Sequence, residues 1–248
     1  MKPELIIPQW PAPANVRAAT TTRRGGVSRP PFDSLNMAGH VGDDPAAVAT
    51  NRQLVAQTLS LADEPWWLSQ VHGTDVVTIE RGYGGLPEAD ASLTQEPGCI
   101  CVVLTADCLP VLFCDQAGSR VAAAHAGWRG LSAGVLEATV RKLAVPESEI
   151  IVWLGPAIGP RSFEVGEEVY RAFVDQDADT AGSFVVSRPG HWFADLYGLA
   201  RRRLELVGVT AVYGGGLCTF EDRERFYSFR RDGKTGRMAS LIWLQPSV

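Results

Sequence analysis

The chain has 248 residues and a formal net charge of −5, a balance that gives no reason to expect a nucleic-acid partner or a membrane-surface partner. No apolar run reaches the about 18 residues that a membrane-spanning helix needs, and the start Met1-Lys2-Pro3-Glu4 is unlike a signal peptide. Five cysteines without disulfide-like spacing are expected to be free thiols in a reducing compartment. Together these features predict a soluble cytoplasmic protein, and we expect a monomer.

The first half of the chain predicts a short strand, a helix and a second strand. The helix has the clearest start, because Asp44 suits the N-cap and Pro45 suits the first helical position. A turn of arginines and glycines at 22–28 either offers N–H groups and guanidinium to an anion or is a solvated surface loop, and the residues alone favour the loop. The predicted strands are 16–21 and 74–80, the helix is 45–59, and a flexible glycine-rich loop follows at 82–85.

The second half of the chain predicts buried strands with helices between them. Apolar residues at helical spacing indicate one helix over 131–144 and another that begins at Asp195 and is closed by Gly208. Strands and helices mix without strict alternation, which predicts a single domain over residues 1–248 with a mixed sheet. The other expected elements are strands at 101–104, 121–124, 150–154, 210–213, 227–231 and 239–244, a helix at 165–173 and a loop-rich excursion at 175–190.

Three potential metal ligands lie where predicted strands or apolar runs end. Cys108 and His125 each follow a buried strand, and His72 follows a third apolar segment. Alanines around His125 leave room near its imidazole, where a strand chosen for packing alone would favour larger side chains. Imidazole and thiolate are good zinc ligands, and three protein ligands leave a fourth position for water or substrate.

The long sequence separations between these residues favour a catalytic metal site over a structural one. Cys108 lies 36 residues after His72 and 17 before His125, so the three converge only through the fold, as in a catalytic site. Asp107 is either an outer-shell acceptor for a ligand N–H or a local cap. Two other interpretations remain: a buried cysteine with two structurally satisfied histidines, or a nucleophilic pair with Cys108 as thiolate and His125 as base.

The segments around the ligands form recognisable motifs: QVHG at 70–73, ADA at 89–91, TADCLPV at 105–111 and AHAGWRG at 124–130. These motifs resemble those of the bacterial YfiH-like, laccase-domain family. Further matching segments lie at 22–28, 34–36, 154–159, 163–166, 218–219, 226–231 and 235–237, so the resemblance spans nearly the whole chain. Two departures are Ser162-Phe163, where the family commonly has Cys-Tyr, and an apolar stretch at 214–217.

Members of this family were long called polyphenol oxidases and are now described as zinc-dependent purine nucleoside phosphorylases, and also as a peptidoglycan editing factor. The resemblance implies Zn²⁺ held by His72, Cys108 and His125. It implies an α+β fold (CNF/YfiH-like) with a central mixed β-sandwich flanked by helices. It also implies phosphorolysis of adenosine, inosine, guanosine and methylthioadenosine, with adenosine deaminase activity in addition. The expected small-molecule partners are therefore a purine nucleoside and phosphate.

Four further residues are candidate substrate contacts. Arg23 and Arg230 are expected to hold an anion such as phosphate, and Arg230 is also counted with His72, Cys108 and His125 as catalytic. Asn36 lies in a polar loop that matches the family. Glu164 either contacts ribose hydroxyls or serves a helix N-terminus.

The competing functions differ in what they need from the chain. A multi-copper phenol oxidase needs many histidines, and this chain has four, at 40, 72, 125 and 191, which leaves only a lone copper in the zinc site. A hydrolase built on Cys108 and His125 and an enzyme that edits peptidoglycan precursors are further alternatives. A zinc-stabilised binding module is the non-enzymatic alternative, but structural zinc sites usually have four protein ligands and no fourth is suggested here.

Overall fold

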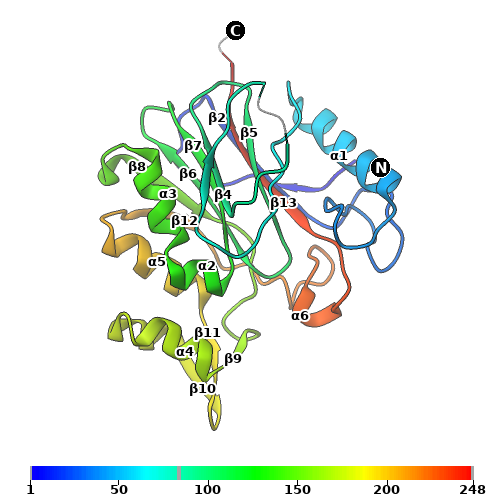
Figure 1. Ribbon diagram of the computed structural model, residues 1–248. Coiled ribbons are helices and arrows are strands. Elements are labelled where there is room, and N and C mark those ends of the chain that lie inside the picture. The colour runs from blue at the N-terminus through cyan, green and yellow to red at the C-terminus, as the bar shows by residue number, and fades with distance from the viewer. Residues whose placement is uncertain (1, 83–84, 247–248) are drawn as a thin grey trace.

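Two sheets stacked face to face form the centre of the computed structural model, which describes residues 2–82 and 85–246 (Figure 1). The smaller contains, in spatial order, β1 (Leu5–Ile6), β2 (Val16–Thr21), β13 (Met238–Leu244) and β5 (Ile100–Thr105). The larger contains β12 (Ala211–Gly214), β8 (Ile150–Leu154), β6 (Leu109–Asp115), β7 (Val121–Ala126), β4 (Ala91–Thr94) and β3 (Val76–Thr78). The second sheet has both parallel and antiparallel pairs, so the expected mixed sandwich is confirmed.

Helices cover the outer faces of both sheets. Side chains alternate along β5, so Cys101 and Val103 point between the sheets while Val102 points outward, where it packs with Val55 of α1 (Pro45–Leu59). On the outer face of the larger sheet lie α2 (Trp128–Ala133), α3 (Val135–Leu143) and α5 (Leu196–Leu206). The result is four layers in the order helix, sheet, sheet, helix (Figure 1).

A small third sheet projects from the bottom of the view in Figure 1, together with α4 (Glu167–Val174). Its strands are β10 (Phe184–Arg188), β11 (His191–Ala194) and β9 (Glu164–Gly166), in that order. The expected helix at 165–173 therefore starts late, because its first residues pair with β11. The expected loop at 175–190 is wrong as well, since it contains a 3-10 helix (Ala178–Ser183) and β10.

Several other boundaries differ from expectation for local reasons. The helix expected at 131–144 is two helices, separated by Gly134 with φ 102°. The strand expected at 227–231 is instead the short helix α6 (Phe229–Asp232), which starts where the Ser228 hydroxyl accepts a bond from the Arg231 amide. The caps Asp44 and Asp195 are confirmed, and a 3-10 turn (Glu147–Glu149) precedes β8.

Residues 83 and 84 of the expected glycine-rich loop lie outside the described residues. Among the described residues, none of the helices is both long enough and apolar enough to cross a membrane.

Candidate metal centre

The three predicted ligands come from three connections at one end of the sandwich. Cys108 lies in the turn 106–108, where the chain crosses from β5 in one sheet to β6 in the other. His125 is the penultimate residue of β7 and is paired with Pro110 of β6, while His72 lies in the loop before β3. The fold thus brings together residues that are far apart in the sequence.

The donor atoms of His72, Cys108 and His125 all lie within 4.8 Å of one another. The sulfur of Cys108 is 4.0 Å from Nε2 of His72, and the two imidazole rings are close to perpendicular at 78°, with centroids 4.8 Å apart. Tetrahedral zinc, with bonds of about 2.0–2.3 Å, holds such donors roughly 3.3–3.6 Å apart. The Cys108–His72 pair would need to approach by only about 0.4 Å and the widest pair by up to about 1.5 Å, and the donor set of two imidazoles and one thiolate fits a metal ion of this kind.

Two glycines keep the space beside the ligands open. A Cβ atom at Gly127 would lie 2.9 Å from Cδ2 of His72 and 3.0 Å from the sulfur of Cys108, closer than real Cβ contacts. A Cβ atom at Gly130 would lie 2.9 Å from the carbonyl oxygen of Gly73. The first turn of α2 therefore packs directly against the His72 loop, and larger residues at 127 or 130 would displace the ligands.

Asp90 is a fully buried carboxylate that organises two of the three ligands. Its Oδ1 accepts bonds from Nδ1 of His125 at 2.7 Å and from the backbone N–H of His72 at 3.0 Å. Its Oδ2 accepts the N–H groups of Gly73 and Val71. The bond to Nδ1 leaves Nε2 of His125 for a metal. Burial opposes ionisation of Asp90, but the bonds from His125 and Gly73 outweigh it and lower the pKa of this carboxyl.

The sequence interpretation missed the role of Asp90. Its signal was present in the ADA motif, where small neighbours leave room for a buried carboxylate just before a strand. The sequence suggests Asp107 instead, next to Cys108, either as an acceptor for a ligand N–H or as a local cap.

Asp107 braces the Cys108 turn rather than a ligand side chain. One of its oxygens accepts the hydroxyl of Thr219 at 2.6 Å, and the other accepts the hydroxyl of Ser228 and the backbone N–H of Arg230. Asp107 has φ 97° and His72 has φ 63°, both in the left-handed region. That conformation costs about 1–2 kcal/mol for an ordinary residue, so the surrounding contacts hold both turns in strained shapes beside the site.

The ionisable groups of the centre shift each other's pKa. Burial opposes the thiolate of Cys108, but the charge of His125 and hydrogen bonds from both histidines outweigh it and lower the pKa of Cys108 to about 6. Burial likewise disfavours charged His125, yet Cys108 and Asp90 raise its pKa to about 9. Burial instead raises the pKa of Cys114 to about 12. Of these two thiols, the one at the centre is therefore poised as thiolate, the form that binds metal.

Arg230 lies beside the Cys108 turn, since its backbone N–H donates to Asp107, and its side chain contacts Glu164 of the small sheet. Nη1 of Arg230 donates to the backbone oxygen of Glu164 at 2.8 Å, and the guanidinium lies 5.2 Å from the ring of Phe163. The carboxylate of Glu164 is engaged elsewhere, with Arg188 at 3.0 Å and Ser187 at 2.9 Å. Arg230 thus connects the Cys108 turn to the small sheet, and the carboxylate of Glu164 faces the β10 strand.

Arg23 and Asn36 have other partners. Arg23 pairs with Asp33 at 3.3 Å and lies 4.9 Å from the Tyr227 ring, beside a hollow of about 480 Å³ whose lining includes none of the triad. In the adjoining glycine turn, the N–H groups of Gly26 and Val27 are bound to Ser34 and Asn51 side chains rather than open to an anion.

Asn36 is fully buried, and its amide is occupied by protein partners. Its side-chain N–H groups donate to the Ala38 carbonyl and to Asp43. Its oxygen accepts the backbone N–H of Ala38 and that of Arg237. Asn36 therefore holds the segment that carries Arg237, an arginine absent from the predicted substrate contacts.

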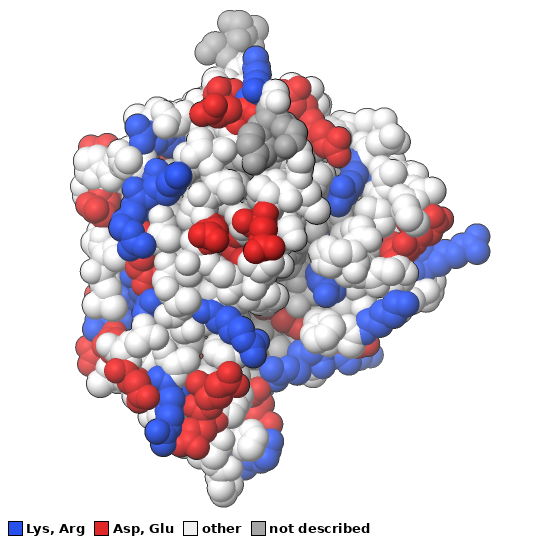
Figure 2. All heavy atoms as spheres, viewed as in Figure 1, with Lys and Arg blue, Asp and Glu red and all other residues white. Residues whose placement is uncertain are grey.

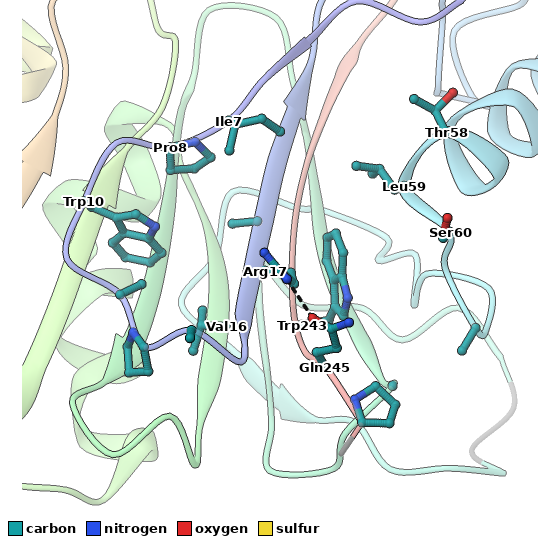
Figure 3. Close-up of a pocket in the computed structure, with 17 residues that line it drawn as sticks. Ile7, Pro8, Trp10, Val16, Arg17, Thr58, Leu59, Ser60, Trp243 and Gln245 are labelled. Carbon is teal, nitrogen blue, oxygen red and sulfur yellow. Dashed lines mark hydrogen bonds between the residues drawn. The ribbon is translucent and has the colours of Figure 1, made fainter. Parts of the chain in front are cut away.

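A larger hollow of about 670 Å³ lies away from the centre, on the outer side of the smaller sheet (Figure 3). Trp10 and Trp243 stand on its two sides, and Arg17 between them donates to Gln245 at 2.8 Å. None of its described lining residues is a His, Cys, Asp or Glu. This hollow therefore offers no metal-binding or acid–base side chain among the described residues.

Comparison with known proteins agrees with the motifs. A family model described as multi-copper polyphenol oxidoreductase laccase matches residues 17–245. The chain belongs to this family. A purine nucleoside phosphorylase of Pseudomonas aeruginosa is 60% identical over 97% of this chain and 98% of its own length. The purine nucleoside phosphorylase YfiH of Escherichia coli is 53% identical over 97% and 99%.

Solved structures of family members show the same fold. A crystal structure of a Neisseria meningitidis protein covers 98% of this chain and 99% of its own, with a TM-score of 0.94 and 51% identity. YlmD from Geobacillus stearothermophilus covers 98% and 100%, with a TM-score of 0.88 and 33% identity. The resemblance inferred from the motifs is thereby confirmed, and so is the fold class.

Proposed function

We propose that this protein is a zinc-dependent purine nucleoside phosphorylase. It would cleave the bond between ribose C1′ and purine N9 of adenosine, inosine, guanosine and methylthioadenosine, with phosphate as the nucleophile. The observation that carries the proposal is the convergence of His72, Cys108 and His125 within 4.8 Å, braced by Asp90. Relatives at 60% and 53% identity that bear the name purine nucleoside phosphorylase support it.

The ligand set favours a single zinc over a copper cluster. Within residues 2–82 and 85–246, one group of three metal-ligating side chains is close enough to share an ion. A multi-copper centre needs several such groups and many more than four histidines. Two imidazoles and one thiolate suit zinc and leave one coordination position open.

Asp90 orients a ligand imidazole, and Arg230 is available to bind phosphate. When bound, zinc supplies positive charge that polarises and orients phosphate. Asp90 accepts a hydrogen bond from the Nδ1–H group of His125 and leaves Nε2 for the metal. With both nitrogens engaged, the imidazole would exchange no proton with substrate. Arg230 uses only Nη1 in its described side-chain hydrogen bonds, so its other N–H groups are available to the phosphate.

In the reaction, an oxygen of hydrogen phosphate forms a bond to C1′ as the C1′–N9 bond breaks. The purine leaves with the electron pair and gains one proton, which balances the proton that hydrogen phosphate loses. Holding phosphate and ribose together supplies most of the advantage over free solution. The products are the free base and ribose 1-phosphate. The open ligand position also supports a second activity, deamination of adenosine at C6 by water.

The deciding experiment is chromatography of adenosine and inosine after incubation with zinc-loaded protein, with and without phosphate, beside Cys108→Ala as control. Base release that depends on phosphate and is absent in the variant supports the proposal. Inosine formed from adenosine without base release would make deamination the main activity. No turnover of any nucleoside by zinc-loaded protein would refute the proposal in favour of a Cys108 hydrolase or an enzyme that edits peptidoglycan precursors.

A further inference from the structure

Arg237 is a half-buried cation with no carboxylate partner among the residues that the structure describes. Its Nη1 donates to the carbonyl oxygens of Thr235 and Gly236 at 2.9 and 3.0 Å, and its backbone N–H donates to Asn36. Among the described residues, no Asp or Glu pairs with it within 4.0 Å, and Nε and Nη2 make no hydrogen bond. Neither atom is among the buried polar atoms that lack a partner, so both donors reach solvent and are free to bind a ligand.

The β-ladder places Arg237 beside the metal centre. Met238 of β13 is paired with Thr105 of β5, and the chain beyond Thr105 turns directly into the segment that carries Cys108. On its other side, the guanidinium carbon of Arg237 lies 5.7 Å from the ring of Phe229, which is 58% exposed. The next residue in α6, Arg230, donates its backbone N–H to Asp107 in the same turn. Arg237 therefore stands between the Cys108 turn and α6.

The charges around Arg237 leave room for an anion. Burial lowers the pKa of Arg237, partly offset by the negative charges of Cys108 and Asp107, which are near enough to act on it. Both oxygens of Asp107 already accept hydrogen bonds, and a bound metal would neutralise the negative charge of the Cys108 thiolate. Burial lowers the pKa of His40, and the charges of Arg237 and then Arg52 lower it further. His40 and Arg52 are therefore two more basic side chains near Arg237.

The surface agrees with this charge pattern. Figure 2 shows Lys and Arg side chains gathered across the lower centre of the face that carries α6 and the small sheet in Figure 1. Two acidic side chains on this part of the chain are committed to partners, Glu164 to Arg188 and Asp232 to Arg231.

We infer that Arg237 binds the phosphate used in phosphorolysis, through Nε and Nη2, as a second anion contact alongside Arg230. These two N–H groups form the edge of the guanidinium that matches two phosphate oxygens, while Nη1 anchors the side chain to the backbone. The ring of Phe229 lies on the α6 side of the guanidinium and leaves this edge without a competing polar group. The inference rests on the proposed function for the identity of the anion, but phosphate binding at Arg237 can be measured without any nucleoside.

The first test uses the wild-type zinc-loaded protein and phenylglyoxal, which modifies arginine, with peptide mass spectrometry to follow each site. Saturating inorganic phosphate should slow modification of Arg237 about fivefold or more, because the two N–H groups are occupied. Arg171, an exposed residue of α4 paired with Glu167, should react at the same rate with and without phosphate. An unchanged rate at Arg237 would overturn the inference, whatever the variants show.

The second test measures phosphate affinity by calorimetry in zinc-loaded variants. Arg237→Gln should weaken phosphate binding roughly 10- to 100-fold, the range for losing a hydrogen-bonded charge, and Arg171→Gln should leave it unchanged. Zinc content and the thermal midpoint report whether Arg237→Gln is folded, and Arg237→Lys, which keeps the charge without the two-pronged edge, should bind phosphate more weakly than wild type. Phosphate affinity within twofold of wild type in folded Arg237→Gln would contradict the inference.

The two proposals can fail separately. Phosphate protection of Arg237 together with no nucleoside turnover would retain the anion site and refute the phosphorylase. Phosphate-dependent base release without protection of Arg237 would retain the phosphorylase and place its phosphate elsewhere.

Discussion

The metal ligands and the arginines of this protein are held in different ways. His72, Cys108 and His125 lie at strand ends or tight turns, and the fully buried Asp90 fixes two of them through short hydrogen bonds. The arginines near them lie on a short helix and a strand start, held mainly by bonds to backbone carbonyl oxygens. The candidate metal centre is therefore braced by one buried carboxylate, whereas the arginines are positioned by backbone oxygens of several segments.

The largest expected effect comes from removing the sulfur ligand. Cys108→Ala leaves two imidazoles, so zinc and nucleoside cleavage should both be lost, while the far-UV CD spectrum stays largely native because the two-sheet core does not depend on the metal. Metal analysis and CD on the same preparation check this. Cys114→Ala, at a buried thiol between the sheets, is the matched control and should retain zinc. Normal zinc content in Cys108→Ala would remove Cys108 from the site.

Asp90→Asn tests whether the buried carboxylate sets the ligand geometry. The amide keeps the shape but places an N–H group against donors from the His72 loop, so zinc affinity should fall about 10- to 100-fold. Competition with a chromogenic chelator measures this affinity. Asp75→Asn, an exposed carboxylate in the same loop, should behave like wild type. Equal zinc affinity in Asp90→Asn and wild type would mean that the ligands need no such brace.

The pH dependence of alkylation tests the thiolate in the metal-free protein. The pKa of Cys108, lowered to about 6, means that its reactive thiolate forms as pH rises through about 6 and is lost below it. At neutral pH, Cys108 should therefore react with iodoacetamide roughly tenfold faster than an ordinary thiol. Peptide mass spectrometry gives the rate, and zinc should suppress it. A midpoint near 9 would show that the histidines do not stabilise the thiolate.

The smallest effects are expected at Arg230 and Arg23, which test whether the anion contacts are less critical than the metal ligands. Arg230→Ala should raise the apparent KM for phosphate about fivefold with little change in zinc content, because it removes an exposed anion contact. Arg23→Ala should leave phosphate kinetics nearly unchanged, because Arg23 is occupied by Asp33. Steady-state kinetics at varied phosphate measure both. A larger effect at Arg23 than at Arg230 would show that the phosphate site lies in the other hollow.

The features predictable from the sequence were those that depend on local pattern. Cys108 and His125 follow buried strands, and Asp44-Pro45 marks a helix start, so each is visible from its neighbours. The break between α2 and α3 could not be predicted, because helical spacing continues across Gly134 and only its left-handed backbone ends the first helix.

The features missed by the sequence interpretation depend on distant contacts. Asp90 becomes a brace only because strand β4 pairs with β7 and carries it to His125. Residues 227–231 have the composition of a strand, but Asp107 accepts hydrogen bonds from this segment and draws it into a short helix. Arg237 owes its place to β13 pairing with β5 across more than a hundred residues of chain.

The central claim is that His72, Cys108 and His125 together hold one zinc ion, and the metal content of the purified protein tests it most directly. Emission spectrometry of stringently purified protein, made without added metal, should give about one zinc per chain and negligible copper. Zinc well below one per chain that zinc supplementation does not restore, or copper in its place, would contradict the assignment.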